Sequence, residues 1–434
     1  MENCYFTLLL CRQSPTFDLS SSLSINRSNS VNLARPRPRV LFLSAEWPEN
    51  KISASARRAA ALLETLQRVY EVEVVIIPLR IDTSRPAHSP YPEVPLPNSR
   101  SWRLQRALAD RVPLLFQLYL RAPLDRHGNT RKRTKALRQV TAHKSFDLIF
   151  VMRLLNVPYA FELSRSRGGV PIWLDLDDLE SSKNEQISRL PFVAHGKKSR
   201  LFHATLAAGY RRFEARWLKH CERLFVCSSL DQQRVVGSYP DLDVRVVPNP
   251  TPPVNQTTRE RPTDDSWNYL FFGTLNYPPN FDAVVWLGQE IWPLIRAKSR
   301  DILHIAGQSA SRELVQQLEP IEQLDYRGFI PLEENIYNET DVVLIPLRAG
   351  SGTRLKALEA FAARVPVIST SLGVEGLGAI PETHYLRAET TQEFADQAHR
   401  LKSDPALFAK LRASGSHLAH EAQNSTLRLA AVQP

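Results

Sequence analysis

Short apolar runs alternate with stretches of helical periodicity along most of the chain, and this alternation begins at Arg39. Short apolar runs between polar turns indicate buried strands, and apolar positions three and four apart indicate helices. Strands are predicted in the first part at 40–44, 71–78, 146–152, 170–176, 223–228 and 244–247. Helices are predicted between them at 53–69, 157–166 and 207–220, with further helical spacing over 101–121 and 131–141.

A proline-rich segment at 248–253 interrupts the alternation and predicts a stiff hinge. After it, strands are predicted at 267–272, 302–306, 342–346 and 367–369, and helices at 280–296, 311–318 and 353–363. Strands that alternate with helices over short links indicate parallel sheets with helices on both faces. The chain is therefore predicted to be α/β, with two doubly wound Rossmann-like domains and a ligand site in the cleft between them.

The predicted domain boundaries follow from this pattern. The first domain spans 39–247, and the second spans 248–434 and includes the terminal helices. Residues 1–38 are rich in Ser, Asn and Arg, and we treat them as a disordered or targeting extension outside the fold.

The composition is typical of a soluble globular protein, with 43% hydrophobic and 23% charged residues among 434. No apolar run is long enough for a transmembrane helix. Four cysteines are too few for a disulfide framework, so we expect a cytoplasmic protein.

Positive charge is concentrated in one stretch. Residues 101–150 hold eleven Lys or Arg against three acids, a net of +8 out of +10 for the chain. Such a stretch is either a solvated helix face or a surface that meets phosphate groups. Because it matches no recognised nucleic-acid-binding module, we expect no nucleic acid. We prefer a peripheral contact of residues 101–144 with an anionic inner membrane surface.

The most informative segment is Gly350-Ser351-Gly352-Thr353-Arg354-Leu355-Lys356-Ala357-Leu358-Glu359, which follows a predicted strand. Glycines in a turn let a ligand approach the backbone, and the unpaired N–H groups of a helix start attract phosphate. Arg354 and Lys356 add mobile positive charge, and Glu359 lies where a carboxylate can accept hydrogen bonds from ribose hydroxyls. The spacing matches neither the Walker nor the dinucleotide pattern, so an ordinary loop with surface Arg and Lys remains the alternative.

Short motifs in a fixed order accompany this segment. They are Val247-Pro248-Asn249-Pro250, Phe272-Gly273-Thr274-Leu275 with Pro279-Asn280, Ile305-Ala306-Gly307, Arg327-Gly328-Phe329, Pro366-Val367-Ile368-Ser369-Thr370 and Gly373-Val374-Glu375-Gly376-Leu377. With them the sequence resembles the retaining glycosyltransferases of family four over about residues 39–413, and within that family the PEP-CTERM and exopolysaccharide branch. The resemblance implies a GT-B fold, in which the first domain binds the acceptor and the second a nucleotide-sugar donor.

The resemblance also assigns roles to residues. It implies that Arg354 and Lys356 stabilise the leaving diphosphate and that Asp178 belongs to the catalytic groups. It places the donor against Gly273, Thr274, Arg327, Gly350, Ser351, Gly352, Thr353 and Glu359, and the acceptor against Arg153 and Asp177. From the residues alone, Thr274 fits a tight turn, Arg327 a surface salt bridge and Asp178 a helix cap equally well.

Three positions depart from the family pattern. Ser351 stands where the family has a glutamate, and Arg364 stands where a glycine usually ends the helix in a left-handed conformation. The loop at 44–48 lacks the usual glycines, which removes the basis for a close contact of its backbone with the donor.

The implied reaction moves a sugar, with retention, from a nucleoside diphosphate to a hydroxyl of a polysaccharide, glycan or lipid-linked acceptor. Neither a cofactor nor an obligatory metal is expected. A nucleotide-sugar epimerase on the same fold and a non-catalytic GT-B binding protein are the alternatives.

Overall fold

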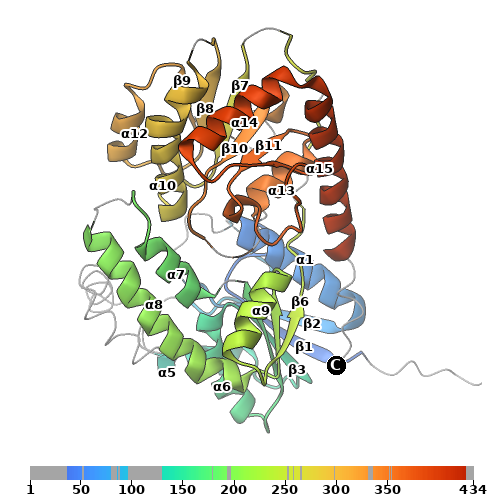
Figure 1. Cartoon of the computed structure of the whole chain (residues 1–434). Helices are drawn as coiled ribbons and strands as arrows, with labels where there is room; N and C mark the ends of the chain where they lie inside the picture. Colours follow the sequence, from blue (N-terminus) through green and yellow to red (C-terminus); the bar gives the residue numbers. More distant parts are fainter. Residues whose placement is uncertain are drawn as a thin grey trace, which may run out of the picture. The chain divides into compact units, whose positions relative to one another are not determined.

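A computed structural model describes residues 37–50, 53–79, 86, 88–95, 130–177, 179–192, 197–251, 254–257, 259–263, 266–297, 299–330, 336–350, 352 and 354–426. The described residues form two six-stranded parallel sheets, one in each half of the chain (Figure 1). Helices flank both sheets, which confirms the predicted α/β class with two Rossmann-like arrangements. The predicted helix at 101–121 lies outside the described residues.

The sheet of the first half has the strand order β2-β1-β3-β4-β5-β6. Its strands are β1 (Arg39–Ser44), β2 (Glu71–Ile76), β3 (Leu148–Met152), β4 (Ile172–Asp177), β5 (Arg223–Val226) and β6 (Asp243–Val246). In β1, Leu41 and Leu43 pack on one face of the sheet, whereas Val40 and Phe42 pack on the other. Successive side chains of a strand point to opposite faces, and both faces of this sheet are covered. All four of these residues are therefore buried, which explains the continuous apolar run.

The helices of the first half largely agree with the predicted periods. They are α1 (Ala54–Val69), α5 (Thr130–Val140), α6 (Val157–Arg165), α7 (Glu180–Ser188), α8 (Lys197–Trp217) and α9 (Ser229–Ser238), with 3-10 turns at Leu154–Asn156 and Leu218–His220. Helix α7 was not predicted, and α8 begins about three turns earlier than predicted. Helix α7 has no apolar stripe that a periodicity argument could detect, because two of its three buried residues, Ser181 and Asn184, are polar.

The sheet of the second half has the order β12-β11-β10-β7-β8-β9. Its strands are β7 (Asn268–Phe272), β8 (Ile302–Ala306), β9 (Leu324–Gly328), β10 (Val342–Ile345), β11 (Val367–Ser369) and β12 (Leu386–Arg387). Helices are α10 (Pro278–Trp286), α11 (Trp292–Ile295), α12 (Arg312–Leu318), α13 (Leu355–Ala362), α14 (Thr391–Ser403) and α15 (Pro405–Thr426). A π-helical turn at Leu287–Ile291 joins α10 to α11, and 3-10 turns span Ile336–Glu339 and Leu372–Val374.

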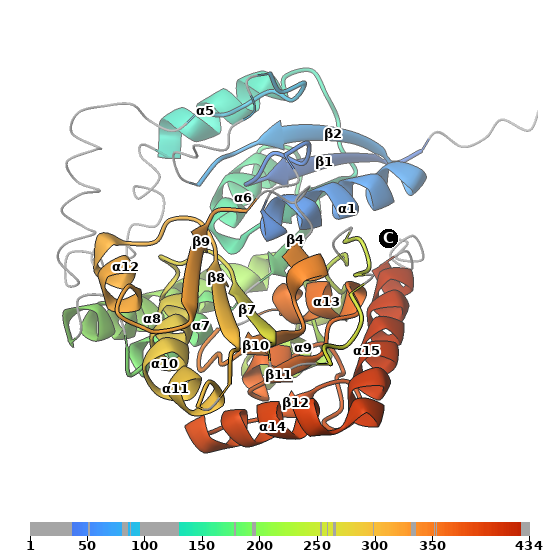
Figure 2. The same ribbon diagram turned by 90° about the horizontal axis from the view of Figure 1, so that it is seen from above.

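Helices α1 of the first half and α13 of the second lie side by side (Figure 2), joined by an ion pair from Arg57 to Glu359. Each helix follows the carboxyl end of a strand, where open α/β sheets bind ligands. The left-handed conformation expected of Arg364 is confirmed, since its φ is 62°.

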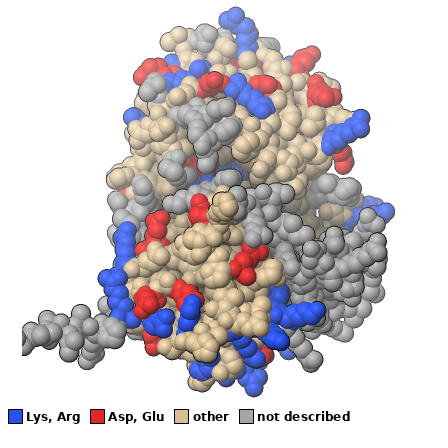
Figure 3. Space-filling view, turned by 180° about the vertical axis from the view of Figure 1, so that it is seen from behind, with Lys and Arg blue, Asp and Glu red and all other residues tan. Residues whose placement is uncertain are grey.

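The described part of the basic stretch differs from the prediction at one residue. Arg133 is buried at 2% exposure, and its guanidinium donates hydrogen bonds to the carbonyl oxygens of Pro78 and Val94. It therefore does not belong to a basic surface, whereas Lys132, Lys135 and Arg138 on the same helix are exposed. Over the described residues seen in Figure 3, Lys and Arg are mixed with Asp and Glu. No helix among the described residues is long and apolar enough to cross a membrane.

Candidate functional site

The segment from Gly350 to Glu359 leaves the buried strand β10 and enters α13, as predicted. Gly350 and Gly352 have φ values of 140° and 73°, which side chains with a Cβ rarely adopt. A Cβ added to Gly350 would lie 2.6 Å from Nη1 of Arg354, so the guanidinium packs directly on this glycine. Ser351 and Thr353 lie outside the described residues.

Arg354 is a fixed, buried side chain and not the mobile surface charge expected from the sequence. It is 7% exposed, its Nε donates a hydrogen bond of 2.8 Å to the carbonyl oxygen of Leu372, and its Nη2 lies 3.2 Å from Oε2 of Glu375. A guanidinium held in this way is already oriented, so little conformational entropy is lost when it binds an anion.

Lys356 is held in a comparable way. Its Nζ donates a 2.7 Å hydrogen bond to Oδ1 of Asn280 and lies 4.5 Å from the ring centroid of Phe271. A Cβ added to Gly273 would lie 2.9 Å from the same Nζ. Burial lowers the pKa of Lys356 to about 7; Glu359 raises this pKa and Arg354 lowers it, both by a smaller amount.

Gly273 therefore lies next to Lys356. Both residues were assigned to the donor site from the sequence. Gly273 follows β7, and Gly307 follows β8. A Cβ added to Gly307 would lie 1.8 Å from the carbonyl oxygen of Gly273, so only glycine fits there. Thr274 is exposed, and its carbonyl oxygen accepts a 2.9 Å hydrogen bond from Asn280.

Glu359 is buried at 9% exposure beneath α1. Its Oε1 lies 3.1 Å from Nη2 of Arg57, and the hydroxyl of Tyr337 donates a 3.4 Å hydrogen bond to Oε2. Burial raises the pKa of Glu359, although Arg57 and Lys356 lower it. The carboxylate is therefore shared by both halves of the chain.

Two further side chains of the first half contact the segment or the carboxylate of Glu375 that holds Arg354. Gln186 on α7 accepts a 3.0 Å hydrogen bond from the backbone N–H of Gly350. Arg234 on α9 lies 2.7 Å from Oε1 of Glu375, the carboxylate that also holds Arg354. Arg57, Gln186 and Arg234 had no motif or spacing in the sequence that could have identified them.

The acidic run at the end of β4 forms a separate cluster. Asp177 pairs with Nη1 of Arg153 at 2.9 Å, as predicted, and both residues have positive φ, 58° and 72°. Left-handed backbone at non-glycine residues stores strain and is common at functional sites. Asp178 lies outside the described residues. Within the described part of the chain, no three His, Cys, Asp or Glu side chains gather as a metal site.

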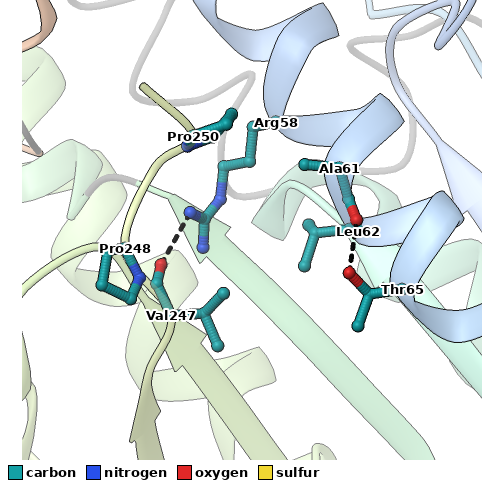
Figure 4. A pocket seen from close by; sticks show the side chains of 7 residues that line it. All are labelled: Arg58, Ala61, Leu62, Thr65, Val247, Pro248 and Pro250. Carbon is teal, nitrogen blue, oxygen red and sulfur yellow. Dashed lines mark hydrogen bonds between the residues drawn. The ribbon is translucent and has the colours of Figure 1, made fainter. Parts of the chain in front are cut away.

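Beneath this cluster, Arg58 is 1% exposed and pairs with Asp175, which is fully buried. It also donates to the carbonyl oxygen of Val247 at 2.9 Å (Figure 4). The cavity between Arg58, α1 and the prolines Pro248 and Pro250 measures about 10 Å³. That volume holds about one water molecule, so this place is part of the packing between α1 and the hinge and not a substrate site.

Arg327 lies at the end of β9, where its guanidinium pairs with Asp325 at 2.9 Å and with Glu339 at 2.6 Å. Both carboxylates are about half exposed. Arg327 therefore takes part in a surface ion-pair network, the alternative that its sequence context left open.

The second half matches the family model described as Glycosyl transferases group 1 over residues 267–404. A curated relative, the uncharacterized 44.6 kDa protein in the cps region of Klebsiella pneumoniae, is 31% identical over 120 residues. This match spans 26% of the chain and only about a third, 31%, of that relative.

Solved structures share the fold over the whole of the two halves. Sucrose-phosphate synthase from Thermosynechococcus elongatus has a TM-score of 0.65 at 16% identity, covering 91% of this chain and 98% of that one. Alr3699/HepE from Anabaena, determined in complex with UDP and glucose, has a TM-score of 0.57 at 14% identity, covering 90% and 98%. The two sheets thus have the GT-B arrangement. At these identities the similarity concerns the fold, and the reaction has to be argued from the site.

Proposed function

We propose that the protein is a glycosyltransferase that moves a sugar from a nucleoside-diphosphate sugar to a hydroxyl acceptor with retention. The observation that carries the proposal is the convergence of two restrained cations, Arg354 and Lys356, on two glycine turns, at Gly350 and Gly273. Glycine backbone, the start of α13 and fixed positive charge are together the features that recognise a diphosphate.

In the proposed reaction, the barrier comes from negative charge that builds up on the leaving diphosphate. The side chains of Arg354 and Lys356 are held in place before the donor binds, so they stabilise this charge without moving, and Lys356, whose pKa is about 7, carries its proton when the diphosphate is bound. Glu359 is buried one helical turn beyond Lys356, where it accepts hydrogen bonds from the donor ribose. The diphosphate assists deprotonation of the acceptor on the same face of the sugar, as expected for retention.

The acceptor is proposed to enter from the side of Asp177 and Arg153, whose ion pair, formed between two residues with left-handed backbone, fixes a carboxylate at the carboxyl edge of the first sheet. A glycan or lipid-linked hydroxyl compound fits such a site, because a carboxylate orients sugar hydroxyls by accepting their hydrogen bonds. For the proposed membrane contact, the exposed Lys132, Lys135 and Arg138 are the residues to neutralise. Unchanged cosedimentation with phosphatidylserine vesicles after neutralisation would refute that contact.

A thermal-shift screen with UDP-, GDP- and ADP-sugars tests the donor, since a ligand that binds the folded state raises the melting temperature. The stabilising donor is then incubated with and without acceptor extracts, and the products are analysed. Transfer that depends on an acceptor supports the proposal. Isomerisation of the donor sugar without an acceptor supports an epimerase instead, and binding without any product supports a binding protein.

A further inference from the structure

The carboxylate of Glu375 connects the two halves of the chain at the donor segment. Glu375 follows the 3-10 turn Leu372–Val374 and is 15% exposed at its side chain. Its Oε2 lies 3.2 Å from Nη2 of Arg354, within the second half. Its two oxygens lie 2.7 Å and 3.4 Å from Nη2 and Nη1 of Arg234, which belongs to α9 of the first half.

Arg234 is itself held in place before it reaches Glu375. Helix α9 begins after Ser228, whose hydroxyl oxygen accepts a hydrogen bond from the backbone N–H of Asp231. One turn later, Nη1 of Arg234 lies 3.5 Å from Oδ1 of Asp231. The cap and the pair restrict the position of the guanidinium, whose planar, two-pronged set of N–H groups matches a carboxylate.

The shared carboxylate has a consequence for the charge at Arg354. A glutamate that faced Arg354 alone would neutralise it and hold its N–H groups. Because Arg234 binds the same carboxylate more closely, part of the negative charge is compensated from the first half. Glu375 therefore orients Arg354 without cancelling its charge. The guanidinium stays positive on the side of Gly350, against which its Nη1 packs.

We propose that Arg234 is a positioning residue for Arg354, acting through Glu375, so that the first half of the chain completes the diphosphate site. The inference rests on the proposed function, since it takes Arg354 to bind the donor diphosphate. It adds a role for α9, a helix of the predicted acceptor-binding half. The contact also couples closure of the two halves to the orientation of the cation that the leaving group needs.

The test compares Arg234→Gln, Arg234→Lys and Glu375→Gln with wild type in donor-dependent transfer. Arg296→Gln is the matched control, because Arg296 is 28% exposed against 30% for Arg234 and pairs with Glu322 at the same 2.7 Å. Arg296 and Glu322 precede β8 and β9, whereas the site follows the carboxyl ends of the strands. We expect Arg234→Gln to lower kcat about tenfold with little change in KM, the pattern of an interaction needed mainly in the transition state. Arg234→Lys should recover part of the loss, and Arg296→Gln should leave both constants unchanged.

A double-mutant cycle separates action through Glu375 from a direct contact with the donor. If Arg234 acts through Glu375, Arg234→Gln has no further effect in the Glu375→Gln background. Additive losses would overturn the proposal, and so would an Arg234→Gln enzyme with wild-type kcat. Urea unfolding of each variant excludes a loss of folded protein as the cause, because kcat is referred to the folded fraction. If the wild-type protein binds no nucleotide sugar at all, it is the proposed function that fails. The role of Arg234 fails only if transfer occurs and does not depend on Arg234.

Discussion

Lys356 should make donor binding depend on pH in a way that few surface lysines could. Its amine is packed between Asn280 and Phe271, and burial lowers its pKa from 10.5 to about 7. A diphosphate bound beside it favours the protonated form, so binding above pH 7 must take up a proton. Lys356→Met keeps an unbranched side chain only one atom shorter and removes the titrating group.

The size of the pH effect on donor affinity follows from the pKa of Lys356. At pH 8, one unit above about 7, about one lysine in ten is charged, so each bound diphosphate takes up about 0.9 proton. Charging the amine at that pH costs about 1.4 kcal/mol, which corresponds to about tenfold in affinity. Affinity should therefore fall by about tenfold for each pH unit well above 7. The phosphate groups do not account for this fall, because their last pKa is about 6.

Isothermal titration calorimetry with the nucleoside diphosphate, in buffers of different ionisation enthalpy, measures the proton uptake directly. Wild type should show uptake at pH 8 and little at pH 6, and Lys356→Met should show neither the uptake nor the decline in affinity. The same pKa has an effect on folding: the unfolded chain binds more protons than the folded one between about pH 7 and 10.5, so this lysine makes stability rise with pH in that window. Equal proton uptake in wild type and Lys356→Met would refute the reasoning.

Three other substitutions test separate parts of the structure. Arg58→Met leaves a fully buried carboxylate without its partner and should lower the free energy of unfolding by about 3–5 kcal/mol in urea titrations; a loss below about 1 kcal/mol would contradict the buried ion pair. Gly307→Ala forces a Cβ onto the carbonyl of Gly273, and it should abolish the donor-induced thermal shift while Gly237→Ala, at an open helix position, does not. Arg57→Gln removes the ion pair to Glu359 across the two halves and should raise the KM for the donor about tenfold; an unchanged KM would exclude a role for that pair in closure.

The sequence predicted the fold well, and it predicted the order of strand, turn and helix in the candidate donor segment, because both depend on local patterns. The strand, glycine turn and helix around Gly350–Glu359 are contiguous, and their periodicity and turn residues are visible without any structure. Gly273 and Gly307 belong to short motifs that follow β7 and β8, and it is the structure that brings them into contact.

The contacts between the halves were not predictable from one sequence. Arg57 and Glu359 are 302 positions apart, and Arg234 and Glu375 are 141 apart, so no spacing rule connects them. Burial was the second source of error. Arginine is usually found at the surface, but Arg133 and Arg354 lie inside the protein. Carbonyl oxygens and a carboxylate from distant segments accept hydrogen bonds from their N–H groups.

The central claim is that Arg354 and Lys356 bind the diphosphate of a nucleotide sugar. The most direct measurement is the dissociation constant of the nucleoside diphosphate selected by the thermal-shift screen, for wild type and Arg354→Ala at pH 7. Removing the buried guanidinium of Arg354 removes charge-assisted hydrogen bonds to the diphosphate, so Kd should increase about 30-fold or more. An Arg354→Ala protein that is folded and binds the nucleotide with the wild-type Kd would contradict the assignment of this segment as the donor site.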